Sequence, residues 1–211
     1  MKIAALWYGL LVCGPVTAQS LEPLDWAGLY VGANFSSAQA DVSDNYDSSQ
    51  LFKFSVDGTA LGAQLGYNLQ RGFFVVGLEA DVTVGSIAGI GECPPPTCVG
   101  TGSQPEIDIE RRATVRARVG IAHRNMLYFA TLGRSFADAN VNDPFQGGSD
   151  NHRHQGVLAG IGVDWKFSDK LSAGAEYTYG RYEDIPYALI ITPDVIGFET
   201  RELRLGVKVS F

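Results

Sequence analysis

The stretch RRATVRARVG at residues 111–120 decides between the folds open to this sequence. Arg116 and Arg118 alternate with Val115, Ala117 and Val119, so an extended strand would have one basic and one apolar face. A soluble strand would turn the arginines to water, and a nucleic-acid-binding strand would turn them to phosphates. A strand of a transmembrane barrel would turn them to the interior. The rest of the chain decides among these three arrangements.

Composition narrows the choice. The chain has 211 residues, of which 45% are hydrophobic and 18% charged, so we expect one folded domain. The net charge of −7 disfavours attraction to nucleic acid, and we expect no such partner. The basic run at 111–118 opposes this overall sign, so it needs a local explanation.

Residues 1–18 have the features of a secretory signal peptide. Lys2 gives a positive start, the apolar core is too short to span a bilayer as a helix, and small residues precede cleavage after Ala18. A lipoprotein signal ending at Cys13 is disfavoured, because the residue before this cysteine is bulky. We therefore expect residues 19–211 to form one domain in an oxidising compartment.

Two cysteines remain after removal of such a signal. Cys93 and Cys98 lie close together in the Pro- and Gly-rich stretch GECPPPTCVG. We expect a small disulfide-closed loop, since a metal site would need more ligands and no histidine lies near in the sequence.

The mature chain is dominated by segments that alternate with period two. In ETRELRLGVKVSF (199–211) every second residue from Leu203 to Phe211 is apolar, and the residues between are charged, Ser or Gly. No segment has 18 continuous apolar residues, so no helical span is expected. The eight predicted strands are 26–35, 58–69, 73–84, 110–121, 126–136, 157–167, 171–182 and 199–211.

The connections alternate between short and long. Turns at 70–72, 123–125 and 168–170 are short and polar, whereas the predicted loops near 38–57, 86–109, 138–155 and 183–198 are long. This asymmetry is typical of outer-membrane barrels, and closure removes exposed strand edges. We predict an all-β fold, an eight-stranded antiparallel up-and-down transmembrane β-barrel with both ends and the short turns on one rim.

In such a barrel the charged faces of the strands line the lumen. Six acids and six bases nearly balance there, as a narrow interior requires because an unpaired buried charge is costly. Arg134 is favoured on the same polar face, and glycines there make room for long side chains. The predicted luminal network is Glu79, Asp81, Glu110, Arg112, Arg116, Arg118, Asp164, Lys166, Glu176, Glu202, Arg204 and Lys208.

Aromatic residues fit the same arrangement. They lie near strand ends or on apolar faces, as in the aromatic girdles at bilayer interfaces. Phe211, preceded by Val209 and Val207, resembles the C-terminal signal that hands barrels to the assembly machinery; the alternative is an ordinary terminal strand. The aromatic set is Trp26, Tyr67, Phe73, Phe129, Trp165, Phe167, Tyr177, Tyr179 and Phe211.

Several stretches together resemble one family. They are DWAGLYVGANF (25–35), LGAQLGYNLQ (61–70), FVVGLEADV (74–82), ATVRARVGIA (113–122), GIGVDWKFSDKLSAGAEYTYGRY (160–182) and LRLGVKVSF (203–211). They are similar to the small outer-membrane immunogenic proteins of alphaproteobacteria, often called RopB-like. The resemblance covers nearly the whole mature chain and implies an eight-stranded surface barrel, OmpA/OmpX-like in architecture, that contributes to envelope integrity and host contact. Some relatives are described as porins or haem binders, but those activities would reside in the divergent loops.

No arrangement of residues predicts catalysis, so we expect no enzyme, no cofactor and no metal. His152 and His154 are a weak candidate for a ligand such as haem, with an ordinary surface loop as the alternative. The acids Asp41, Asp44 and Asp47 lack the ligand order of a calcium-binding loop.

The sequence therefore predicts a structural barrel of the bacterial outer membrane, with its long loops outside and both termini periplasmic. The alternatives are a small porin or a haem- or ligand-binding surface receptor, and a soluble lipocalin-like protein. Expected partners are outer-membrane lipids and lipopolysaccharide, the barrel assembly machinery through the C-terminal strand, and host surface ligands.

Overall fold

The computed structural model describes residues 23–46, 50–90, 106–143, 148–187 and 194–211. No helix among these residues could cross a bilayer. The predicted signal peptide, Cys93, Cys98 and Asp47 lie outside the described residues. The elements are β1 (Gly28–Tyr46), β2 (Gln50–Arg71), β3 (Phe74–Ile90), β4 (Glu106–His123), β5 (Met126–Asp143), β6 (Gly148–Lys166), β7 (Leu171–Tyr182), β8 (Ile185–Tyr187) and β9 (Asp194–Ser210).

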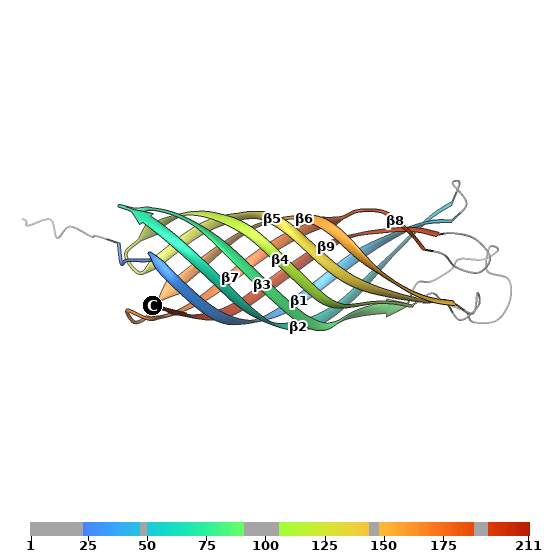
Figure 1. Cartoon of the computed structure of the whole chain (residues 1–211), viewed down its shortest axis with the longest axis horizontal. Helices are drawn as coiled ribbons and strands as arrows, with labels where there is room; N and C mark the ends of the chain where they lie inside the picture. The colour runs from blue at the N-terminus through green and yellow to red at the C-terminus, as the bar shows by residue number, and fades with distance from the viewer. Residues whose placement is uncertain (1–22, 47–49, 91–105, 144–147, 188–193) are drawn as a thin grey trace, which may run out of the picture.

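The strands close into a barrel. Each long strand pairs antiparallel with its neighbours in chain order, β7 pairs with β9, and β9 pairs with β1. The short β8 pairs only with β9 and continues the position of β7 in the sheet. The nine strands therefore occupy eight positions around the barrel. The prediction of an eight-stranded up-and-down barrel is confirmed. Figure 1 shows both ends of the chain at one end of the barrel, which we call the terminal end; the opposite end is the loop end.

The register fixes the tilt of the strands. Following hydrogen-bonded partners once around the barrel from Tyr30 leads back to β1 at Ala40, ten residues further along the strand. A closed barrel with such a stagger has strands inclined to its axis and an interior that side chains can fill. The tilt is visible in Figure 1. Closure also satisfies the backbone groups along the strands, which lipid cannot do.

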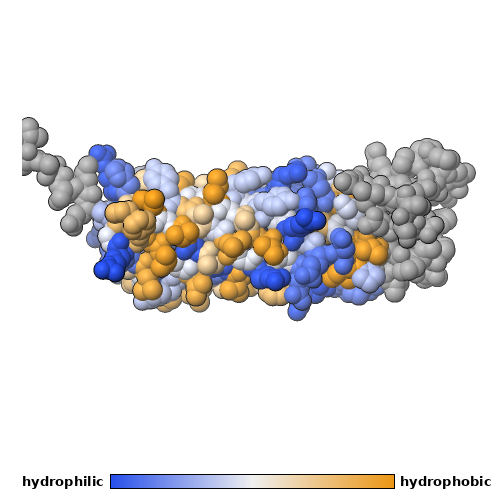
Figure 2. Space-filling model, turned by 90° about the horizontal axis from the view of Figure 1, so that it is seen from above, coloured by the Kyte–Doolittle hydropathy of each residue, from blue (hydrophilic) through white to orange (hydrophobic). Residues whose placement is uncertain are grey.

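The outer surface carries an apolar band over the half of the barrel near the terminal end. Leu78 and Ile161 are 64% and 67% exposed, whereas Arg116 is 1% exposed. Figure 2 shows this band as the part of the surface where hydrophobic residues dominate. Apolar residues outside and charged residues inside are the arrangement of a barrel in lipid, and the reverse of a soluble lipocalin-like barrel.

The strands reverse their polarity toward the loop end. There Ala38, Ala40 and Val42 of β1 point inward, and Gln39 points outward. Side chains from the other strands join them in an apolar cluster, the loop-end cluster. It consists of Ala38, Ala40, Val42, Val56, Ile87, Ile109, Ala137, Ala139, Tyr182, Ile196 and Phe198.

The strands continue through this region of reversed polarity, which corrects the prediction of four long loops. Most residues of 38–57, 86–109, 138–155 and 183–198 that the structure describes lie in strands. A strand of 9–11 tilted residues crosses a bilayer, but β1 has 19 residues and β2 has 22. The barrel therefore continues beyond the apolar band as a water-facing barrel with an apolar core, and its small and polar residues resembled loops in the sequence.

Two aromatics of the predicted girdle lie inside the barrel. Trp26 is 6% exposed and Phe129 is 7% exposed, so the prediction that they face lipid is wrong. Both belong to the terminal-end cluster of Trp26, Val75, Ala122, Leu127 and Phe129. Tyr67, Phe73, Trp165, Phe167, Tyr177, Tyr179 and Phe211 are exposed on the outside.

Candidate functional site: a charged interior between two apolar clusters

The interior holds eleven of the twelve residues predicted for the luminal network. All eleven are buried, from 1% exposure for Arg116 to 8% for Lys208. Glu110 is the exception: it is exposed, so its predicted luminal position is wrong. The β4–β5 register shifts between Ile109 and Arg111, so a β-bulge interrupts the alternation there. Ile109 and Arg112 both point inward as a result.

Arg134 also lies outside the lumen. Its side chain is 61% exposed, and Nη1 is 4.0 Å from Oε1 of Glu183. On β5 the inward positions are taken by Phe129, Thr131 and Ser135, so the favoured placement of Arg134 on the luminal face is wrong. Apolar and small polar residues occur on both faces of this strand, so its sequence alone does not determine which face is inside.

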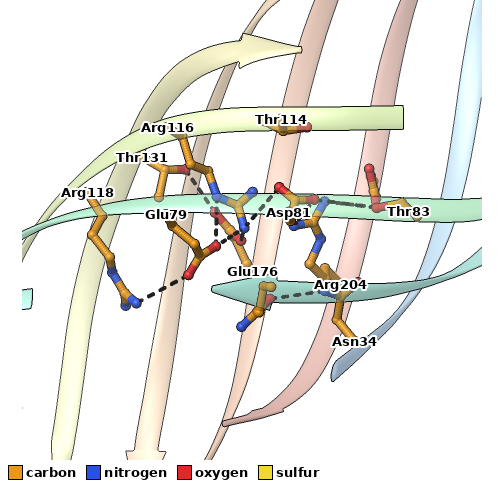
Figure 3. A network of polar contacts seen from close by, with 12 residues as sticks. Asn34, Glu79, Asp81, Thr83, Thr114, Arg116, Arg118, Thr131, Glu176 and Arg204 are labelled. Atoms are coloured by element: carbon orange, nitrogen blue, oxygen red, sulfur yellow. Dashed lines mark hydrogen bonds and ion pairs between the residues drawn. The ribbon is translucent and has the colours of Figure 1, made fainter. Parts of the chain in front are cut away.

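Arg116 is the centre of the largest ion cluster (Figure 3). Its Nε donates to Oε1 of Glu79 at 2.9 Å, and its Nη2 contacts the same oxygen. Nη2 also lies 3.2 Å from Oε2 of Glu176 and 4.0 Å from Oδ2 of Asp81. Thr131 donates a hydrogen bond to Oε1 of Glu176 at 2.8 Å. One guanidinium thus joins carboxylates from β3 and β7 across the lumen.

A second cluster lies toward the terminal end. Asp164 accepts hydrogen bonds from Nη2 of Arg118 at 2.7 Å and from Nζ of Lys208 at 2.8 and 2.9 Å. The hydroxyl of Tyr30 donates to Oε2 of Glu79 at 2.5 Å and accepts from Nη1 of Arg118 at 3.1 Å. Tyr30 therefore connects this cluster to the one around Arg116.

A third cluster lies toward the loop end. Nη2 of Arg112 is 2.6 Å from Oε2 of Glu202. Arg204 bridges the clusters, with Nη1 3.1 Å from Oδ1 of Asp81 and Nη2 3.5 Å from Oε1 of Glu202. Each of the five buried carboxylates of the network thus contacts at least one cationic side chain. Such pairing is what makes ionised groups tolerable in a dry interior.

Lys166 belongs to the terminal mouth of the barrel. Its Nζ donates to the backbone carbonyl of Asp25 at 2.5 Å and lies 5.0 Å from the centre of the Trp26 ring. The backbone N–H of Trp26 donates to Oε1 of Gln70 at 2.6 Å. These contacts hold the segment before β1 across the mouth.

Interior glycines provide the space for the clusters. A Cβ added at Gly174 would lie 2.0 Å from Oδ1 of Asp164, and one at Gly66 would lie 2.3 Å from Oη of Tyr30. Both distances are far below any van der Waals contact. The bulky polar side chains therefore fit only because their neighbours across the strand pair lack side chains.

Apolar side chains lie on both sides of the ion clusters. The guanidinium carbon of Arg118 is 3.9 Å from the centre of the Phe129 ring, which belongs to the terminal-end cluster. At the other end, Tyr182 donates a hydrogen bond to Oγ of Ser135 at 2.8 Å and stacks on Phe198 of the loop-end cluster at 4.4 Å between ring centres. The interior is thus filled by three ion clusters between two apolar clusters.

The candidate histidines lie on a strand, which corrects their placement in a loop. His154 of β6 is fully buried, with its Nδ1 3.0 Å from the carbonyl oxygen of Glu183 and its ring 4.9 Å from that of Phe198. Burial lowers the pKa of His154 below its usual 6.5. Nε2 of His152 is 3.0 Å from Oδ2 of Asp150.

Other polar candidates have structural partners. Asp41 accepts a hydrogen bond from Ser55 at 2.6 Å and lies 2.9 Å from Nη1 of Arg201. Within the described ranges, no group of three or more His, Cys, Asp and Glu side chains is arranged to hold a metal ion.

The C-terminal strand turns its apolar face outward. Val207 and Phe211 are 57% and 74% exposed, and Val209 is 38% exposed. The backbone N–H of Phe211 donates to the carbonyl oxygen of Leu29 at 2.9 Å, which continues the β1–β9 pairing to the chain end. The three residues thus form part of the lipid-facing surface, and their role in assembly stays a prediction.

A closed barrel with an apolar exterior and a paired charged interior defines the class of transmembrane β-barrels. Comparison with known proteins gives the family. Residues 8–211 match the model of the outer membrane protein beta-barrel domain, and the chain belongs to this family. This membership places the protein in the outer membrane.

Relatives and a solved structure agree with this assignment. The 25 kDa outer-membrane immunogenic protein of Brucella canis is 24% identical over 93% of this chain and 84% of its own. The 22 kDa outer membrane protein of Rhizobium leguminosarum bv. viciae is 24% identical over 88% of this chain and 78% of its own. The structure of Neisserial surface protein A covers 88% of this chain and 98% of its own at a TM-score of 0.50 and 15% identity, which shows the fold.

Proposed function

We propose that this protein is a structural barrel that contributes to envelope integrity and displays its loop end to the host or environment. The observation that carries the proposal is the filled interior. Ion clusters centred on Arg116, Asp164 and Glu202 occupy the lumen, and apolar clusters lie on both sides of them. An eight-stranded barrel filled in this way is suited to anchoring a surface, and leaves little room for a permeating solute.

The proposed orientation places the loop end outside the cell and both termini in the periplasm. Outer-membrane barrels have short periplasmic turns, and the short turns of this chain lie at the terminal end. The reversed polarity beyond the apolar band requires water around this part of the barrel, so the loop end extends out of the bilayer on its side of the membrane. The rigid barrel wall, and not only loops, would then be exposed at the cell surface.

The names of the relatives support surface exposure. The Brucella canis relative is named an outer-membrane immunogenic protein, and the proposal extends exposure to the host to the present chain. The proposed partners remain outer-membrane lipids and lipopolysaccharide, host surface ligands, and the assembly machinery acting on the strand that ends at Phe211. We propose no catalytic role.

Site-specific labelling of intact cells tests the orientation. Ser55→Cys at the loop end and Asp169→Cys in a terminal-end turn would each be made in a chain with Cys93 and Cys98 changed to serine. A membrane-impermeant maleimide should label Ser55→Cys on intact cells, and Asp169→Cys only after the outer membrane is permeabilised. Labelling of Asp169→Cys alone on intact cells would show that the terminal end faces outward, and would contradict the proposed orientation.

A further inference from the structure

Two exposed arginines lie where the apolar band of the exterior ends on its loop side. Arg134 of β5 is paired with Val157 of β6, which is in turn paired with Arg181 of β7. The two arginines thus lie two strands apart, about 10 Å between their backbones. Their side chains are 61% and 78% exposed, so both guanidinium groups are accessible from outside the barrel.

The outer surface changes from apolar to mostly polar near these arginines. Val157, which is 48% exposed, lies between the two arginines, and Ile161 and Tyr179, 67% and 39% exposed, continue toward the membrane on β6 and β7. Together these three residues provide an apolar floor. On the loop side, the outward residues Gln155 and Glu183 are exposed and polar, and the outward Phe136 of β5 is half-buried. Such a change from an apolar to a mostly polar surface suits the boundary between the acyl chains and the head group of a lipid.

The neighbouring carboxylates hold these arginines weakly. Nη1 of Arg134 is 4.0 Å from Oε1 of Glu183, and Nε of Arg181 is 3.9 Å from Oε1 of Glu199. Exposed pairs at such distances contribute little to stability. In contrast, Nε of Arg153 donates to Oδ1 of Asp138 at 2.8 Å. Arg134 and Arg181 can thus exchange their carboxylate neighbours for a stronger anionic ligand.

We propose that Arg134 and Arg181 bind the phosphate groups of a phosphorylated lipid in the leaflet at the loop end, while its acyl chains lie on Val157, Ile161 and Tyr179. A guanidinium presents a planar fork of donors that matches a phosphate, which makes arginine suited to this role. The apolar floor between the arginines and on their membrane side selects a lipid over a soluble phosphate. The assignment of the lipid to the outer leaflet rests on the proposed orientation; the binding itself does not.

Lipid binding by the purified full-length protein in detergent tests the proposal. The probes are bis-phosphorylated lipid A and the same lipid with both phosphates removed, each titrated with chelator present and followed by native mass spectrometry. Arg134→Gln and Arg181→Gln should each weaken binding of the phosphorylated lipid about fivefold. Arg153→Gln, which removes the same charge further out on β6, should change it less than about twofold. Heat-modifiable gel migration verifies that every variant is folded.

Three results would overturn the proposal. The first is equal weakening by Arg153→Gln, which would indicate a general effect of net charge. The second is equal affinity of the wild-type protein for both lipids. The third is displacement of half of the lipid by inorganic phosphate at the same concentration as the lipid, which would indicate an anion site without a lipid contribution. Because the measurement is independent of orientation, its failure and that of the labelling experiment can be told apart.

Discussion

Arg116 illustrates why this interior depends on pairing. The side chain is 1% exposed and contacts Glu79, Glu176 and Asp81, which come from two other strands. A buried charge is stable only when its partners compensate for the water it has lost. The alternation of Arg116 and Arg118 with apolar residues therefore reflects two different surroundings, paired carboxylates inside and lipid outside.

Removal of the Arg116 guanidinium should destabilise the barrel strongly. Arg116→Ala leaves Glu79 and Glu176 buried beside each other without their shared cation, at an expected cost of about 3–5 kcal/mol. Urea unfolding of the protein in lipid vesicles measures this change. Arg111→Ala, an exposed arginine on the same strand, is the matched control and should change stability by less than about 0.5 kcal/mol. Equal midpoints for both variants would refute the structural role of the network.

Gly174 gives a second test at this scale. In Gly174→Ala the added methyl group would meet Asp164, whose carboxylate is held by Arg118 and Lys208. We expect a loss of about 1–3 kcal/mol of unfolding free energy in the same urea experiment. Gly72→Ala is an informative comparison: it has open space around it but a φ of 61°, so any cost there comes from the backbone alone.

At the scale of the element, alternation of residue types predicted the strands inside the apolar band. The segment from Leu203 to Phe211 is the clearest case, because apolar and charged residues there occupy opposite faces without interruption. Prediction failed where a local feature changed the phase. The bulge at Glu110 can be recognised only from the backbone pairing of β4 with β5. Whether Arg134 points into or out of the barrel depends on which side chains of β5 fit beside Arg116.

The loop-end strands were missed for a different reason. Ala38, Ala40 and Val42 alternate with polar residues, but with the opposite assignment of faces from the rest of β1. Period two alone does not say which face is inside, and Asp and Ser lower the expectation of a strand. The ion partners across the lumen, such as Asp164 and Lys208, also depend on the register, which composition does not specify.

The loop-end cluster should act as a separate source of stability. Phe198→Ala removes a ring that stacks on Tyr182 and contacts His154, and core replacements of this kind cost about 3–5 kcal/mol. We expect increased proteolysis of the loop-end strands, while the strands within the apolar band stay protected. Phe35→Ala, at a lipid-facing position 47% exposed, should leave loop-end proteolysis unchanged. Loss of protection along the whole barrel would contradict a separate loop-end unit.

His154 should make the loop end sensitive to acid. Burial lowers its pKa below 6.5, so the folded state favours the neutral ring. The unfolded state then binds more protons, and the stabilisation present above about pH 6.5 is lost as the pH falls through the lowered pKa. His152, Glu183 and Asp184 are the other ionisable groups near this ring. Hydrogen exchange of β6 at pH 7.5 and 5.5 should show this loss in the wild type and a smaller one in His154→Gln.

At the scale of the whole molecule, the barrel combines two solvent environments along one set of strands. Near the terminal end the outside is apolar and the inside charged, and near the loop end this order is reversed. At this reversal the apolar outer surface ends, and the strands continue beyond it.

The conductance of single molecules in a planar bilayer tests the filled interior most directly. The three ion clusters and the apolar clusters beside them predict that purified, heat-modifiable protein inserts without opening steady steps of ion current. A larger outer-membrane porin inserted under the same conditions serves as the positive control. Large, steady, single-step conductances from the wild-type protein would contradict a lumen closed by paired charges.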